Sequence, residues 1–197
     1  EEIAKKKEST IYIAFSSGLS GTFQTAILTR DILKDTYPDL DLEIVDSKSA
    51  SVGFGLLVYK VAQMAKEGKS KEEILKILDF YVNHIEHIFT VDNLDYLFRG
   101  GRVSRAVAFM GELLNIKPII SVNEEGKYFT FAKAHGRRKS IDKLYEIVEK
   151  TVATKRINLA VLHGGAREEL NALLERLKKL PNINEIVCSD ISPCLGV

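Results

Sequence analysis

The residues best suited to chemistry lie in the segment Ser16-Ser17-Gly18-Leu19-Ser20-Gly21-Thr22, referred to below as the serine loop. It separates an apolar, β-branched run at residues 11–15 from a segment with helical spacing that begins at Phe23, which predicts strand, loop and helix in that order. The first N–H groups of such a helix lack intrahelical partners and lie at the positive end of its dipole, so they can bind an anion. The candidate ligand-binding residues of this loop, by their hydroxyls or their bare backbone, are Ser17, Gly18, Ser20, Gly21 and Thr22.

The serine loop matches no fixed phosphate-binding or nucleophile motif. It lacks the lysine of the GxxxxGK[ST] loop, and it is not G-x-G-x-x-G. The nucleophile motif G-x-S-x-G would place Ser20 at its centre and Gly18 at its start, but Thr22 stands where the last glycine is required. An ordinary capped turn between a strand and a helix therefore remains an alternative.

An enzyme that uses the same loop is a further alternative. In a serine hydrolase, Ser17 or Ser20 would be the nucleophile and Asp46 or Asp190 the acid. His163 follows a predicted strand and precedes two glycines, a position that suits a general base or a histidine that caps a turn. The other enzymatic alternative is a protein that binds phosphate at the same helix end. The spacing of the residues does not distinguish among these alternatives.

The composition is that of a folded protein without a strong charge bias. The 197 residues are 45% hydrophobic and carry a net charge of +1, which predicts packed cores and no long-range attraction to nucleic acid or to an anionic membrane. The longest apolar run, residues 52–58, is far shorter than the ~20 residues of a membrane helix. We therefore expect a cytoplasmic protein without stable membrane insertion.

Neither the cysteines nor the histidines predict a metal site. Cys188 and Cys194 lack C-x-x-C spacing, which fits a reducing compartment. His84 and His87 stand close together without two further ligands. We expect no metal and no cofactor.

Strands and helices alternate through the first half of the chain. Ser70 and Glu73 have the spacing of a capping box at the start of a helix. The alternation predicts a largely parallel sheet with helices on both faces, and it places the serine loop and residues 46–51 together beyond the carboxyl ends of the strands. The expected strands are residues 11–15, 42–45 and 88–91, and the expected helices end near residues 34, 66 and 83.

The second half of the chain includes a hairpin. Two apolar runs, residues 116–122 and 127–132, flank the turn sequence Asn123-Glu124-Glu125-Gly126. We expect an α/β fold with two domains: a parallel-sheet α/β domain over residues 1–91, and a second α/β domain with a mixed or antiparallel sheet over residues 92–197. The other expected elements are helices at residues 94–98, 103–114, about 140–154 and 168–179, and strands at residues 157–162 and 186–188.

Arg102 follows two glycines and is a candidate for binding a carboxylate or a phosphate, because a guanidinium offers a planar fork of donors. The alternative is an ion pair with Asp92 or Asp95 that braces the domain junction.

Five motifs occur in order along the chain: the serine loop, Asp46-Ser47, residues 93–104 (NLDYLFRGGRVS), residues 114–118 (LNIKP) and Gly126-Lys127. Together they resemble the DegV family of bacterial fatty-acid-binding proteins. The resemblance implies a protein without a catalytic centre that binds a long-chain fatty acid between two α/β domains, with the carboxylate at the serine loop. It also implies a partner, the catalytic subunit of a fatty acid kinase, which phosphorylates the bound acid to an acyl phosphate for phospholipid synthesis.

The resemblance assigns roles to residues at matching positions. Ser17 and Ser20 become the hydroxyl candidates for the head group, Gly21 and Thr22 complete the helix end, and Arg102 and Arg137 are candidates for head-group or kinase-facing charge. Family members usually carry an upstream segment with a Thr-Ser-Gln-Pro element and a downstream His-Thr-Gly-Pro-Gly-like loop. We therefore expect this sequence to be part of a longer protein.

Overall fold

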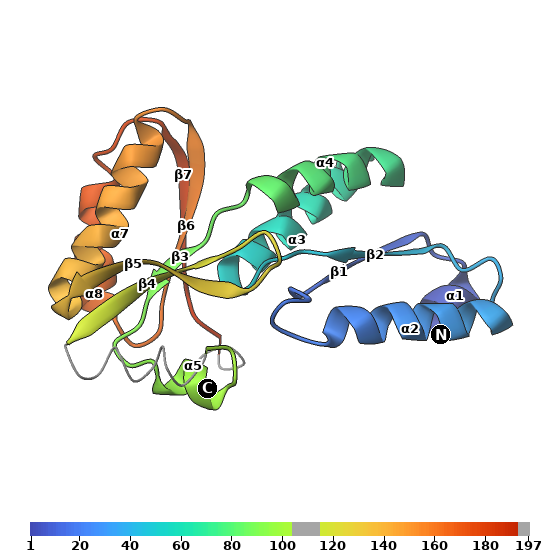
Figure 1. Cartoon of the computed structure of the whole chain (residues 1–197). Coiled ribbons are helices and arrows are strands. Elements are labelled where there is room, and N and C mark those ends of the chain that lie inside the picture. The colour runs from blue at the N-terminus through green and yellow to red at the C-terminus, as the bar shows by residue number, and fades with distance from the viewer. Residues whose placement is uncertain (104–114, 193–197) are drawn as a thin grey trace. The chain divides into compact units, whose positions relative to one another are not determined.

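The computed structural model describes residues 1–103 and 115–192 and divides into two compact units (Figure 1). The first unit holds Glu1–Glu86 together with Val122–Lys127, and the second holds the described residues of His87–Ser121 and Tyr128–Val197. The sequence predicts a single boundary after residue 91. In the structure, Val122–Lys127, which form the tip of the predicted hairpin, belong to the first unit. The predicted pair of domains, 1–91 and 92–197, stays a proposal.

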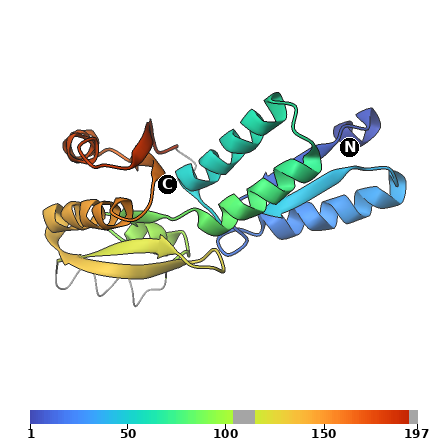
Figure 2. The same cartoon turned by 90° about the horizontal axis from the view of Figure 1, so that it is seen from above.

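The first unit is built on two parallel strands. β1 and β2 pair in register from Thr10 opposite Leu42 to Ala14 opposite Asp46, so both strands end at the same edge. Helix α2 lies along one face of this pair, while α3 and α4 pack together on the other side (Figures 1 and 2). The elements are α1 (Glu2–Lys6), β1 (Thr10–Ala14), α2 (Thr22–Thr36), β2 (Leu42–Asp46), α3 (Ser51–Lys66) and α4 (Lys71–His84).

The predicted capping box is confirmed at the start of α4. The Ser70 hydroxyl accepts from the Glu73 N–H at 3.2 Å, and the Glu73 carboxylate accepts from the Ser70 N–H at 2.8 Å. The capping box fixes the residue at which the helix starts. Ile74 and Leu78, four residues apart, therefore lie on the same face of the helix, and both are buried in the core.

The second unit contains two sheets. In the first, β3 pairs antiparallel with β4, and β5 follows on the other side of β4. In the second, β6 and β7 are parallel, and α7 and α8 pack together beside them around Val152 and Leu177. The elements are β3 (Ile88–Thr90), α5 (Asp95–Arg99), β4 (Ile116–Val122), β5 (Tyr128–His135), α7 (Gly136–Val152), β6 (Ile157–His163), α8 (Arg167–Leu177) and β7 (Ile183–Asp190).

The expected α/β class, with parallel pairing in one part and antiparallel pairing in the other, is confirmed. The last strand is longer than the predicted residues 186–188, because β7 pairs with β6 along Ile183–Asp190 although several of its side chains are polar and exposed. The predicted helix over residues 103–114 lies almost wholly outside the described residues, as does Cys194. Within residues 1–103 and 115–192, no helix combines the length and apolar character needed to cross a membrane.

We expect His87 to make the stability of the second unit depend on pH. Its Nε2 atom is buried without a hydrogen-bond partner among the described residues, and burial lowers the pKa of the imidazole below its ordinary 6.5. The unfolded chain therefore binds a proton more readily than the folded chain, so stability falls as the pH drops below about 6.5.

We expect the free energy of unfolding to decrease between pH 7.5 and pH 5.5, by at most about 1.4 kcal/mol per pH unit from this group. In the variant His87→Gln, urea unfolding should show a much smaller decrease in the free energy of unfolding between these two pH values. The control His135→Gln, at an exposed position, should retain it. Equal pH dependence in both variants would show that His87 does not carry the effect.

Candidate functional site

The carboxylate of Asp46 joins the two loops that follow β1 and β2. Its Oδ1 atom accepts from the Ser17 N–H and from the Lys48 N–H, each at 3.0 Å, and its Oδ2 atom accepts from the Ser17 hydroxyl at 2.5 Å. The two loops meet because Ala14 and Asp46 are register partners at the ends of parallel strands. The predicted meeting of these loops is thus confirmed.

Ser16 ties the serine loop to a third segment, the tip of the β4–β5 hairpin. Its side chain is fully buried, donates to the Gly126 carbonyl at 2.7 Å and accepts from the Gly18 N–H at 3.2 Å. Its N–H donates to the Ser49 carbonyl at 3.1 Å. Sequence reasoning missed this role of Ser16, and the one available signal was that it begins the serine loop directly after an apolar strand.

Glycines on both sides allow this close approach. A Cβ atom on Gly18 would lie 2.5 Å from the Glu125 carbonyl oxygen, and one on Gly126 would overlap the Ser16 hydroxyl. Gly126 also has a φ of +76°, a conformation that side chains disfavour. The Asn123 side-chain oxygen completes the turn by accepting from the Glu125 and Lys127 N–H groups at 3.1 and 2.8 Å.

Two hydroxyls stand at the start of α2. The Oγ of Ser20 lies 2.7 Å from the Oγ1 of Thr22, and it accepts from the Thr22 N–H at 3.3 Å. The N-cap residue is Gly21, which contributes no side-chain cap. Thr22 is exposed and Ser20 is half-buried, so a ligand from solvent can reach this pair.

The two predicted arginines belong to the second unit. Arg137 forms a two-pronged ion pair with Glu169, with Nε–Oε1 and Nη2–Oε2 distances of 3.0 and 2.5 Å. This hydrogen bond lowers the pKa of Glu169 and raises that of Arg137. Arg102 is exposed and donates to the Gly100 carbonyl of its own turn. Both arginines thus belong to a different unit from the serine loop, whose predicted residues lie together in the first unit.

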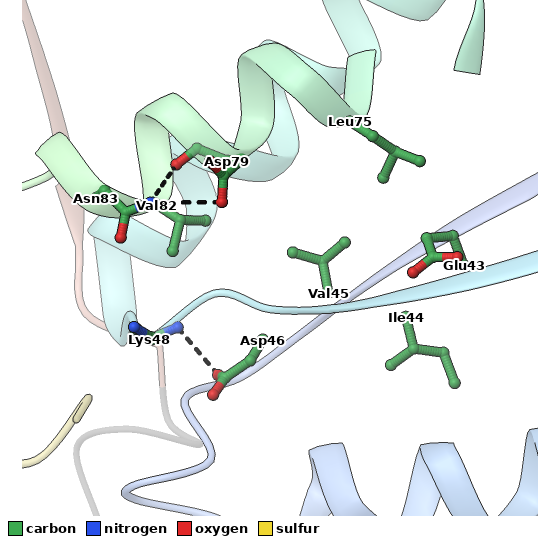
Figure 3. A pocket seen from close by; sticks show the side chains of 9 residues that line it. All are labelled: Glu43, Ile44, Val45, Asp46, Lys48, Leu75, Asp79, Val82 and Asn83. Atoms are coloured by element: carbon green, nitrogen blue, oxygen red, sulfur yellow. Dashed lines mark hydrogen bonds between the residues drawn. The ribbon is translucent and has the colours of Figure 1, made fainter. Parts of the chain in front are cut away.

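A groove of about 320 Å³ lies between β2 and α4 (Figure 3). Its lining residues include the acidic Glu43, Asp46 and Asp79, the basic Lys48 and apolar residues such as Val82. Three carboxylates against one ammonium group give this groove a net negative charge, which disfavours the binding of an anion there.

His163 has a structural position in the second unit. Its Nδ1 atom accepts from the Ala166 N–H at 3.2 Å, and its Nε2 atom lies 2.7 Å from Asp190 Oδ1. These contacts fit the turn-capping interpretation. No group of three or more candidate metal ligands occurs within residues 1–103 and 115–192.

A search of family sequence models finds one whose description is "Uncharacterised protein, DegV family", and it matches residues 1–197. A DegV domain-containing protein of Clostridium perfringens is 41% identical over 197 residues, which cover 100% of this chain and 68% of that protein. The chain belongs to the DegV family. Another DegV domain-containing protein, from Clostridium acetobutylicum, is 35% identical over 202 residues, covering 100% of this chain and 71% of that protein.

Solved structures of DegV proteins share the fold. A DegV protein of Ruminococcus gnavus with vaccenic acid aligns with a TM-score of 0.82 and 26% identity, covering 98% of this chain and 70% of that one. A fatty-acid-binding DegV protein of Streptococcus agalactiae aligns with a TM-score of 0.80 and 26% identity, over 97% and 66% of the two chains. The fatty acid kinase B3 protein of Streptococcus pneumoniae, loaded with linoleic acid, aligns with a TM-score of 0.81 at 24% identity, over 96% and 68%.

The contact between the hairpin tip and the serine loop predicts a difference between two glycine substitutions. Gly126 and Gly68 have similar φ angles, +76° and +78°, but a Cβ on Gly68 would have no neighbour within 4 Å. Alanine at either position is destabilised by the left-handed backbone conformation. Only Gly126→Ala adds a steric overlap with the Ser16 hydroxyl. We expect Gly126→Ala to lower the free energy of unfolding by at least about 1 kcal/mol more than Gly68→Ala.

Urea unfolding of the two variants beside the unchanged chain provides the measurement. Equal losses of stability in both variants would contradict the close packing of the hairpin tip against Ser16.

Proposed function

We propose that this protein binds a long-chain fatty acid, with the carboxylate held at the serine loop, and that it carries this lipid without a catalytic centre of its own. The observation that carries the proposal is the Ser20–Thr22 hydroxyl pair at the start of α2, on a loop held in place by Asp46 and Ser16. Hydroxyls and helix N–H groups are suitable donors for a carboxylate. The two DegV structures at 26% identity that are named for fatty acids support the ligand class.

The contacts of the serines favour a carrier over a serine hydrolase. The Ser17 hydroxyl is bonded to the Asp46 carboxylate, and the Ser20 hydroxyl to Thr22. The Ser17 hydroxyl thus donates its proton to a carboxylate, whereas the nucleophile of a serine hydrolase donates to the imidazole of its general base. The placement of the acyl chain between two domains remains the expectation drawn from the family resemblance.

Native mass spectrometry of the bacterially expressed protein, followed by solvent extraction, tests the ligand. We expect one equivalent of a long-chain fatty acid per chain. A second aliquot treated with a fluorophosphonate should remain unlabelled, because neither serine has the bonding of an activated nucleophile. Covalent labelling that is lost in Ser20→Ala would establish the hydrolase alternative instead. A protein that stays free of lipid after incubation with oleic acid would refute the carrier proposal.

The proposed partner is the catalytic subunit of a fatty acid kinase, which would phosphorylate the bound head group. Of the two candidate arginines, Arg102 suits a partner-facing charge better, because Arg102 is exposed and Arg137 is half-buried. We expect the oleate-loaded chain to support acyl phosphate formation by such a subunit, and Arg102→Gln to reduce the rate without releasing lipid. The control is Arg138→Gln, an exposed arginine beside the Arg137 ion pair. Equal rates in both variants would remove Arg102 from the kinase-facing surface.

A further inference from the structure

The hydroxyl of Ser17 has a single proton, and its direction follows from the neighbouring carboxylate. Asp46 Oδ2 lies 2.5 Å from Ser17 Oγ, and Asp46 Oδ1 is already occupied by two backbone N–H groups. A carboxylate only accepts hydrogen bonds, so the Ser17 proton points to Asp46. Ser17 is left with lone pairs, and toward a ligand it can act only as an acceptor.

The Ser20–Thr22 pair has the opposite capacity. One of the two hydroxyls donates to the other across 2.7 Å, and the second hydroxyl keeps its proton whichever way the pair is arranged. This proton is the loop's available hydroxyl donor, and it lies at the positive end of the α2 dipole. An anionic head group is attracted to this pair and repelled by the lone pairs of Ser17 and the charge of Asp46.

We propose that Asp46 is a positioning residue that assigns the hydrogen-bonding roles in the serine loop. It holds Ser17 as an acceptor and directs the ligand carboxylate to Ser20 and Thr22. This inference rests on the proposed binding of a fatty acid. In this proposal, Asp46 does not contact the ligand and affects its position through the Ser17 hydroxyl.

The substitution Asp46→Asn tests the proposal because it changes the donor pattern and keeps the shape. The amide oxygen can still accept from the Ser17 and Lys48 N–H groups, while the amide nitrogen donates to the Ser17 hydroxyl. The Ser17 proton is then released toward the ligand, and one negative charge is removed. The affinity for oleate should therefore rise, by several-fold, where a purely structural role of Asp46 would make it fall.

The experiment measures oleate affinity by displacement of a fluorescent fatty acid from delipidated protein at neutral pH. We expect the rise in Asp46→Asn to shrink when Ser17→Ala is added, because the released proton is then absent. We expect Ser20→Ala/Thr22→Val to lose about tenfold in affinity, the loss of a hydrogen bond to a charged group, and Ser17→Ala to lose less. Urea unfolding of each variant confirms that the fold is retained.

The outcomes separate this inference from the proposed function. If the unchanged chain binds no oleate, the proposed function and the inference both fail. If it binds oleate but Asp46→Asn weakens binding, or strengthens it equally with and without Ser17, only the inference is overturned. A larger loss in Ser17→Ala than in Ser20→Ala/Thr22→Val would overturn it as well, because Ser17 would then be the donor.

Discussion

The site depends on the hydrogen bonds that a single carboxylate accepts from two loops. Asp46 ends β2, and it binds the backbone and the hydroxyl of Ser17 just after the end of β1. The register of the parallel pair brings these groups together, so the same backbone ladder that forms the sheet also sets the position of the serine loop. The start of α2, and with it the Ser20–Thr22 pair, is thereby fixed against the end of the sheet.

A second constraint comes from a segment distant in the sequence. The hairpin tip reaches the serine loop through Ser16, and the contact tolerates no side chain at Gly18 or Gly126. The loop is therefore held from two sides, by Asp46 and by the hairpin tip. A loop held in this way keeps its donors in position before a ligand arrives, which reduces the entropy lost on binding.

Much of the fold could be read from the sequence, since the capping box at Ser70, the turn at Asn123–Gly126 and the β-branched runs are local signals. The serine loop and its meeting with Asp46 were also predictable, because parallel strands end at one edge. The bond from Ser16 to Gly126 was not, because it joins residues 110 positions apart and no local pattern encodes it. The ion pair of Arg137 with Glu169 escaped prediction for the same reason, as the two residues lie 32 positions apart on different helices.

In the proposed function, a local set of donors in this DegV family protein binds the ligand carboxylate, because the net charge of +1 gives no long-range attraction. A crystal structure of the protein with a brominated long-chain fatty acid tests it most directly, because the bromine and the head group can both be located. We expect the carboxylate to lie within hydrogen-bond distance of the Ser20 or Thr22 hydroxyl, with Ser17 still bonded to Asp46. A carboxylate located away from the serine loop would contradict it.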